Sequence, residues 1–230
     1  MTLESALRLR ARYRREYPKH APLGEAVDDL ILPTRDAALL LVDVYPREGP
    51  EAELVKSVIA PVKAAARSAG IPAVYVTNHL ADSTDASSQW RQVWLRTLGK
   101  DVLKTWAEPS DALQYLPEIT PADGDIVVRK QHYSGFVETE LDGVLRSLGA
   151  RDLFLVGFDA RICVAATATD ALSHNYRVFV LREAVATTDA QDMGGSQNAY
   201  DHALRYIEVC VGYTVAAQDF ISACHQIEAG

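Results

Sequence analysis

Three side chains that together can carry out acyl transfer occur in the order acid, lysine, cysteine: Asp43, Lys130 and Cys163. The thiolate is the nucleophilic form of cysteine, but a free thiol is mostly protonated at neutral pH. The ammonium of Lys130 and the N-terminus of a helix beginning near Cys163 would both lower the pKa of the thiol. Asp43 would accept the thiol proton and later return it to a leaving nitrogen. Backbone N–H groups in the turn before the helix would hold the oxyanion, which completes the requirements for hydrolysis of an amide-like bond.

Each of these residues also has a more ordinary interpretation. A single cysteine is more often a small buried residue than a nucleophile. An aspartate at a strand end often caps a helix or forms a turn, and a lysine there is usually solvated. Their joint placement at predicted strand ends makes the catalytic interpretation about as strong as the ordinary one.

Strands and helices alternate along the chain. The residues 37–45 form a continuous apolar run, which is typical of a strand buried on both faces, and further strands are predicted at 71–78, 125–130, 152–158 and 177–184. Helical patterns cover 51–70, 139–150, 163–175 and 196–210, and a short strand and a last helix follow over 212–227. The predicted fold is α/β, a three-layer αβα arrangement around a mainly parallel central sheet. Asp43, Lys130 and Cys163 then meet at the carboxyl ends of the strands, where such sheets bind ligands.

The chain is predicted to divide into an N-terminal helical arm over residues 1–36 and one catalytic domain over residues 37–230. The 230 residues are 48% hydrophobic, which is enough for one well-buried core. The stretch "SALRLRARYRREY" has helical character but few apolar residues. We expect this arm to pack on a neighbouring subunit or to cover the site.

Charge and cysteine content restrict the partners. The 23 Lys and Arg residues against 31 Asp and Glu give a net charge of −8, which disfavours binding to nucleic acid or to an anionic membrane. No apolar run approaches the length of a membrane span, and the charged N-terminus lacks the apolar segment of a signal peptide. Three widely spaced cysteines are a poor disulfide framework, so we expect a cytoplasmic protein that acts on a small molecule.

Three segments resemble the isochorismatase-like cysteine hydrolases: "ALLLVDVY", "VVRKQHYSGFVETELDGVLRSLGARDLFLVGF" and "ICVAATATDAL". They occur in the family's order and extend over about residues 37–217. The resemblance implies that Asp43, Lys130 and Cys163 form the catalytic triad. It also implies a cis peptide bond between Phe158 and Asp159 and an oxyanion hole built from the backbone N–H groups of Asp159 and Cys163. On this resemblance Cys163 is identified as the nucleophile.

The resemblance also limits the chemistry. Family members that hydrolyse isochorismate lack the cysteine, so Cys163 indicates cleavage of a C–N bond. The block around Lys130 looks most like ureidoacrylate, biuret and N-carbamoylsarcosine amidohydrolases, which implies a small ureido or amide substrate and a covalent acyl-cysteine intermediate. No cofactor is implied. Nicotinamidases carry an Asp-x-His metal site after the second strand, but "VTNHLADSTDASSQW" has only His79 there, so no metal is predicted.

Two alternatives remain open. The sequence has Tyr45–Pro46 where the family often has Gln and Asn, and Asp159–Arg161 where it often has a small residue and Thr. A catalytically inactive member that serves as a binding or scaffold subunit would tolerate such changes. A nicotinamidase-like amidase is the other alternative.

Four residues near the predicted site are candidates for substrate binding: Asn78, Tyr133, Phe136 and Arg161. Asn78 would hydrogen-bond a ureido group, and Arg161 would pair with a substrate carboxylate. Turn formation, core packing and pairing with a protein carboxylate are their ordinary roles. Trp90 and Trp94, four residues apart, are expected in the core or at a subunit contact. Because oligomers are usual in the family, the resemblance implies a homo-oligomer, a dimer or a tetramer.

Overall fold

A single mixed sheet forms the centre of the protein. The computed structural model describes residues 5–16, 24–44, 49–79, 89, 91–96, 115–187 and 196–228. Its eight strands lie in the order β2-β1-β8-β7-β6-β3-β4-β5. The bounds are β1 (Ala6–Arg15), β2 (Gly24–Pro33), β3 (Ala37–Val42), β4 (Ala73–Asn78), β5 (Ile126–Lys130), β6 (Asp152–Gly157), β7 (Arg177–Val185) and β8 (Tyr213–Val215). All neighbours from β8 to β5 pair in parallel, as predicted, and only β1 pairs antiparallel with β2 and β8.

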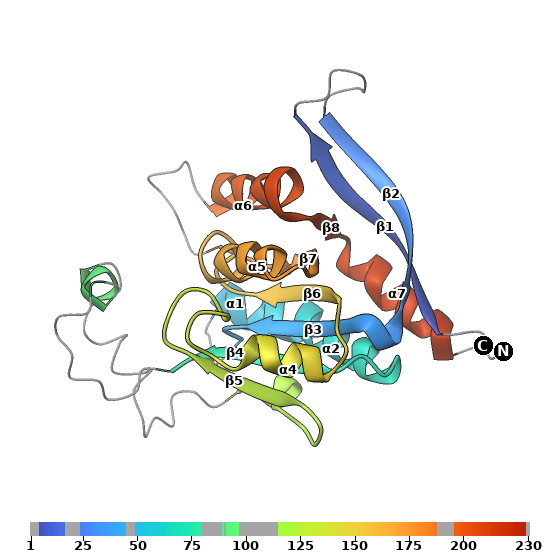
Figure 1. Ribbon diagram of the computed structural model, residues 1–230, viewed down its shortest axis with the longest axis horizontal. Coiled ribbons are helices and arrows are strands. Elements are labelled where there is room, and N and C mark those ends of the chain that lie inside the picture. Colours follow the sequence, from blue (N-terminus) through green and yellow to red (C-terminus); the bar gives the residue numbers. More distant parts are fainter. Residues whose placement is uncertain are drawn as a thin grey trace.

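Helices cover both faces of the sheet, which confirms the three-layer αβα prediction (Figure 1). One face carries α1 (Gly49–Leu54), the π-helical turn Val55–Ile59, α2 (Ala60–Ser68) and α7 (Ala217–Glu228). The other carries α4 (Leu141–Ser147), α5 (Cys163–Ser173), α6 (Ser196–Tyr206) and the π-helical turn Ile207–Val211. Short 3-10 turns lie at Thr34–Asp36 and Pro117–Ile119.

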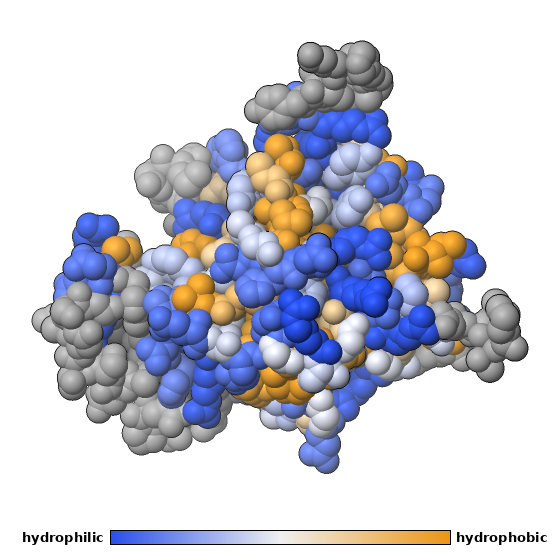
Figure 2. All heavy atoms as spheres, viewed as in Figure 1, coloured by the Kyte–Doolittle hydropathy of each residue, from blue (hydrophilic) through white to orange (hydrophobic). Residues whose placement is uncertain are grey.

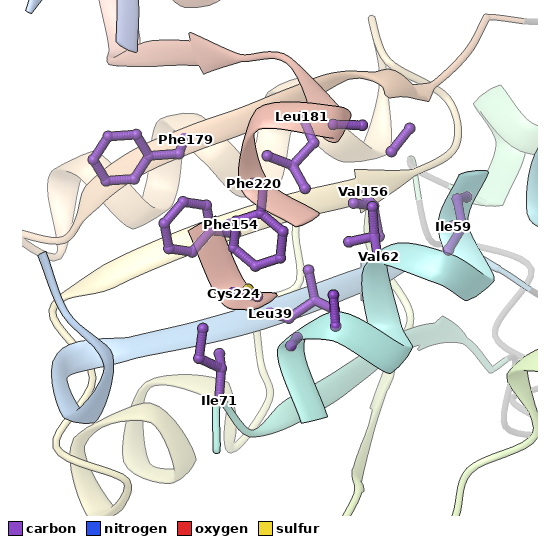
Figure 3. Packing of buried hydrophobic residues seen from close by; sticks show 14 of the residues in the cluster. Leu39, Ile59, Val62, Ile71, Phe154, Val156, Phe179, Leu181, Phe220 and Cys224 are labelled. Carbon is purple, nitrogen blue, oxygen red and sulfur yellow. The ribbon is translucent and has the colours of Figure 1, made fainter. Parts of the chain in front are cut away.

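The central strands build two cores because their side chains alternate between the faces. Every residue of β3, β4 and β6 is buried. On the face of α2 and α7, the ring of Phe154 lies 5.0 Å from that of Phe179 and 4.7 Å from that of Phe220 (Figure 3). Leu39 of β3 packs into the same cluster. Truncating Phe154 to alanine would remove these contacts at a cost of about 3–5 kcal/mol.

The predicted N-terminal helix is wrong: the described part of the arm is a β-hairpin. β1 pairs with β2 along its whole length and joins the sheet through Arg12, which lies opposite Thr214. Leu7, Leu9 and Ala11 are buried while the intervening arginines face outward. This period of two is the signature of a strand. In the sequence it is visible as the alternation of apolar residues with arginines. Figure 1 shows the hairpin extending beyond the helices.

One buried carboxylate ties the hairpin to the body. Glu208 lies in the π-helical turn after α6, and its side chain is only 1% exposed. It accepts hydrogen bonds from Arg12 Nε at 2.6 Å, from Arg14 Nε at 2.8 Å and from Thr214 Oγ1 at 2.7 Å. A buried carboxylate with two cations and a hydroxyl is well satisfied, so Glu208 fixes β1 against β8.

The surface of the protein carries both hydrophilic and apolar side chains (Figure 2). Figure 2 shows mainly hydrophilic side chains with separate apolar patches, one over α6 and one beside the hairpin. The hairpin contributes the exposed side chains of Val27 and Ile31. Among the described residues, no helix is both long and apolar enough to cross a membrane.

Candidate active site

The predicted acid, lysine and cysteine meet at the carboxyl edge of the sheet. Asp43 follows the last residue of β3, Lys130 ends β5, and Cys163 begins α5 after the turn that follows β6. Because these strands are parallel, their carboxyl ends lie on the same edge (Figure 1). The Nζ of Lys130 lies 2.9 Å from Asp43 Oδ2 and 3.5 Å from Cys163 Sγ. The topology therefore joins residues that are 87 and 33 positions apart in the sequence.

Lys130 is the hub of this cluster. It is fully buried, and its ammonium also donates to the side-chain carbonyl of Asn78 and to the backbone carbonyl of His132 at 3.3 Å. Burial alone would lower the pKa of Lys130, but the charge of Asp43 and the hydrogen bonds to Asp43 and Cys163 raise it above the ordinary value. Lys130 is therefore held as an ammonium.

Backbone geometry aims Asp43 at the lysine. Its φ is 50°, which non-glycine residues seldom adopt, while its N–H donates to the carbonyl of Val76 at 2.9 Å. Its Oδ1 accepts the backbone N–H of Asn78 at 2.9 Å. Gly157 lies beside this turn at φ 116°, and a Cβ there would lie 2.0 Å from the Val42 carbonyl oxygen. Only glycine allows β6 to approach β3 this closely below the site.

The pKa of Cys163 differs from the sequence-based expectation. Burial raises it, the negative charge of Asp43 raises it further, and the opposing effect of Lys130 is smaller, so the net shift is upward. The sequence shows the lysine and the helix N-terminus, both of which lower the pKa of the thiol. It does not show that Cys163 is only 7% exposed, and this burial raises the pKa. This shift favours the protonated thiol over the thiolate before substrate binds.

The turn before α5 has the backbone form that the resemblance implied. The peptide bond between Phe158 and Asp159 is cis, which confirms that prediction. The Asp159 carbonyl accepts the N–H groups of Ile162 at 3.0 Å and Val164 at 3.1 Å, and its carboxylate accepts the N–H of Arg161 at 3.0 Å. Cys163 is the first residue of α5, where backbone N–H groups have no carbonyl in a preceding helical turn. The assignment of the Asp159 and Cys163 N–H groups to an oxyanion hole stays a prediction.

Asn78 has a different position from the one expected of a substrate ligand. It is 2% exposed, its side-chain oxygen faces Lys130, and its backbone N–H faces Asp43. It therefore connects two members of the cluster and orients both.

Tyr133 and Arg161 line a cavity of about 640 Å³, which also includes Ile162, the residue directly before Cys163. The ring of Tyr133 lies 5.2 Å from that of Trp94, and burial raises the pKa of its hydroxyl. The Nε of Arg161 lies 3.4 Å from the carboxylate of Asp159, which is the ordinary pairing considered from the sequence. Both remain placed to contact a substrate.

The prediction that Phe136 walls the site is wrong. Its ring stacks on His174 with the centroids 4.9 Å apart, and it lies 6.0 Å from the ring of Tyr176. His174 follows the last residue of α5, whereas Cys163 is the first, so Phe136 lies at the opposite end of the helix, about 16 Å along its axis. Packing against His174 and Tyr176 at that end holds Phe136 away from the site.

Sequence reasoning missed Tyr115, which lies near the site. Tyr115 is hydrogen-bonded to Thr77, 2.9 Å between the two hydroxyl oxygens, and burial and the charge of Asp43 raise its pKa. No motif marks Tyr115 in the sequence. Trp94, expected in the core or at a subunit contact, is 1% exposed and packs against Tyr133. Tyr45, Pro46 and Trp90 lie outside the described residues, as does the segment 80–88.

Within the part of the chain that the structure describes, no group of three or more His, Cys, Asp or Glu side chains is placed to hold a metal ion. Most of the loop on which the metal prediction was based lies outside that part.

Comparison with known proteins gives the class. The isochorismatase domain family matches residues 37–219. A ureidoacrylate amidohydrolase RutB from Pseudomonas syringae pv. syringae is 32% identical over 166 residues, 68% of this chain and 65% of that protein, so the alignment spans less than two thirds of that relative. Another from Yersinia enterocolitica is 29% identical over 86% of this chain and 93% of its own. The chain belongs to the isochorismatase family.

Solved structures agree with the fold. A cysteine hydrolase from Pseudomonas syringae pv. phaseolicola superposes with a TM-score of 0.76 at 22% identity, over 85% of this chain and 95% of that one. The N-carbamoylsarcosine amidase from Thermoplasma acidophilum has a TM-score of 0.63 at 30% identity, over 79% of this chain and 96% of its own.

Proposed function

We propose that this protein is a cysteine-dependent amidohydrolase that cleaves a C–N bond of a small ureido or amide compound. The observation that carries the proposal is the buried contact of Lys130 with both Asp43 and Cys163. A fully buried ion pair beside a thiol is costly to maintain, and it suits a nucleophile whose proton must be removed within the site. The relatives named amidohydrolases act on C–N bonds, which supports this reaction class.

The first half of the reaction acylates the enzyme. As the thiol of Cys163 attacks the carbonyl carbon, its proton moves to Asp43, because the raised pKa of the thiol disfavours a thiolate before substrate binds. The backbone N–H groups of Asp159 and Cys163 hold the oxyanion. Asp43 then gives its proton to the leaving nitrogen, the C–N bond breaks, and ammonia or an amine departs from an acyl-cysteine thioester.

The second half reverses these roles. A water molecule gives a proton to Asp43 and attacks the thioester carbonyl. The C–S bond breaks, the carboxylic or carbamic acid departs, and the proton on Asp43 returns to Cys163. Lys130 keeps its charge throughout and stabilises whichever of Asp43 and Cys163 is negative.

Two residues on the substrate side have separate roles. Tyr133 walls the space next to Cys163. Arg161 pairs with a carboxylate of the substrate, because its guanidinium lines the same cavity and precedes the nucleophile by two residues.

Release of ammonia from a panel of ureido acids, simple ureas and primary amides tests the proposal. We expect turnover of at least one ureido acid by the wild type and none by Cys163→Ala. Nicotinamide belongs in the panel, because its exclusive hydrolysis would favour the nicotinamidase-like alternative. An absence of turnover on the whole panel by folded protein would favour the binding-subunit alternative.

A further inference from the structure

The cavity next to the turn that precedes Cys163 is larger than a ureido group requires. Its volume of about 640 Å³ is typical of sites for drug-sized ligands, and a ureido group would fill only a small fraction of it. It runs between α5 and α6, which lie side by side on the same face of the sheet (Figure 1). The hydroxyls of Thr169 in α5 and Tyr206 in α6 are 2.9 Å apart, so the two helices are joined at its wall.

One end of this cavity lies next to the turn that precedes Cys163. Arg161 and Ile162, which line it, are the two residues directly before Cys163. Tyr133 also lines it, and the charge of the Lys130 ammonium acts on its hydroxyl. A substrate held by Cys163 would therefore extend its remaining atoms into the space between the helices.

The walls favour an apolar group. Four alanines line the space, two from α5 and two from α6, and their small side chains leave the volume open. Tyr133 and Tyr206 add aromatic surface. Ala166 is a partly buried member of this wall, and a larger side chain there would occupy the space.

Charge differs between the two ends. Arg161 is at the end nearest the nucleophile, whereas Asp170 lies seven residues beyond Cys163, about 10 Å along α5. A carboxylate near the scissile group would face Arg161. A second carboxylate farther along the molecule would face Asp170 and be repelled.

We propose that this cavity selects ureido acids that carry a bulky apolar side chain, with the carboxylate at Arg161 and the apolar side chain between α5 and α6. The substrate class is an N-carbamoyl amino acid with an aromatic or branched aliphatic side chain. This inference rests on the proposed amidohydrolase function. It adds a preference for size and apolarity and a discrimination against a second acid group.

Three compounds separate these features: N-carbamoylphenylalanine, N-carbamoylglycine and N-carbamoylaspartate. We expect kcat/KM of the wild type for the phenylalanine compound to exceed that for the glycine compound at least tenfold, with the aspartate compound the poorest. Equal values, or a preference for the glycine or aspartate compound, would overturn the inference while leaving the amidohydrolase function intact.

Ala166→Leu tests the cavity directly. The substitution fills the space, so the ratio of kcat/KM for the phenylalanine compound to that for the glycine compound should fall at least tenfold. Ser173→Leu is the matched control, because Ser173 is an exposed residue of the same helix, seven positions farther on, outside the cavity lining. It should leave the ratio unchanged, and an unchanged ratio in Ala166→Leu would contradict the inference.

A second variant does not depend on how α5 accommodates a larger side chain. Asp170→Asn removes the repelling charge at nearly constant volume, and kcat/KM for the aspartate compound should rise at least threefold relative to the glycine compound. If the relative rise is absent, Asp170 does not have this role.

Calorimetric binding of the phenylalanine compound to Cys163→Ala separates the cavity assignment from the amidohydrolase function. If Cys163→Ala binds the compound, Cys163→Ala/Ala166→Leu does not, and the wild type shows no turnover, the amidohydrolase function is rejected and the cavity assignment is kept. An absence of both binding and turnover would reject the cavity assignment.

Discussion

The Nζ of Lys130 lies 3.5 Å from the Sγ of Cys163, and both residues are buried. A lysine this close to a thiol is often taken to produce a resting thiolate. In this site burial and the nearby carboxylate of Asp43 outweigh it, so the pKa of Cys163 is raised. The proposed mechanism therefore forms the nucleophile during attack on the substrate, with Asp43 as the base, rather than before it.

This shift predicts a dependence of stability on pH. Because the pKa of the Cys163 thiol is higher in the folded than in the unfolded protein, the folded state retains the proton above pH 8.5, near which an unfolded cysteine ionises. Stability is then fully present below about pH 8.5 and falls above it, by up to about 1.4 kcal/mol per pH unit. Urea unfolding from pH 7 to 10 should show this loss in the wild type and a smaller loss in Cys163→Ala. If stability falls equally steeply with pH in the wild type and in Cys163→Ala, the pKa of the thiol is not raised. Cys210→Ala is the control, and because Cys210 is exposed this variant should behave as the wild type.

Thiol labelling should follow exposure. Cys210 is exposed, whereas Cys163 and Cys224 are buried, so iodoacetamide should modify Cys210 first in the native protein. This differs from what the sequence alone suggests, since the lysine and the helix N-terminus would have made Cys163 the fastest to react. Peptide mapping after brief labelling distinguishes the two. Faster modification of Cys163 would show an accessible thiolate and would contradict an upward shift of its pKa.

Asn78 should act as a positioning residue. Asn78→Ala removes the acceptor that faces Lys130, so the ammonium loses one of its fixed contacts. We expect kcat to fall about 10²-fold while KM changes little, because a misplaced group near the reacting atoms costs about that much. The high-pH limb of the pH–rate profile should also move to lower pH, since the lost hydrogen bond stabilised the charged form of Lys130. A raised KM with unchanged kcat would restore the original interpretation of Asn78 as a substrate ligand.

The alternation of apolar strands with amphipathic helices is enough to predict the parallel sheet, the strand ends at Asp43 and Lys130 and the helix start at Cys163, because that pattern depends on local burial. The hairpin is harder to predict although Leu7, Leu9 and Ala11 alternate with arginines, because a high arginine content is also typical of helices. Phe136 follows Lys130 by six residues, yet packing against His174 holds it away from the site. The raised thiol pKa depends on burial by residues distant in the sequence, which no local motif encodes.

The attachment of the hairpin should depend on Glu208. Glu208→Gln replaces a carboxylate that accepts from Arg12 and Arg14, and the loss should destabilise the protein by about 2 kcal/mol, since both arginines are partly exposed. For a chain of this size that lowers Tm by several degrees, roughly 2–4 °C per kcal/mol. Asp29→Asn is the control, because its pair with Arg10 is 3.6 Å long and highly exposed, and it should change stability by less than about 0.5 kcal/mol. Equal effects of the two substitutions would show that Glu208 does not anchor the hairpin.

The rate of ammonia release by Cys163→Ala, measured on the best ureido substrate of the wild type, tests the central claim most directly. Circular dichroism and thermal unfolding at pH 7 establish that the variant is folded, which its small change in side-chain volume favours. We predict a loss of at least about 10³-fold in kcat/KM, because the acyl intermediate forms on the thiol that this variant lacks. A folded variant that retains more than about a tenth of the wild-type activity would contradict the assignment of Cys163 as the nucleophile.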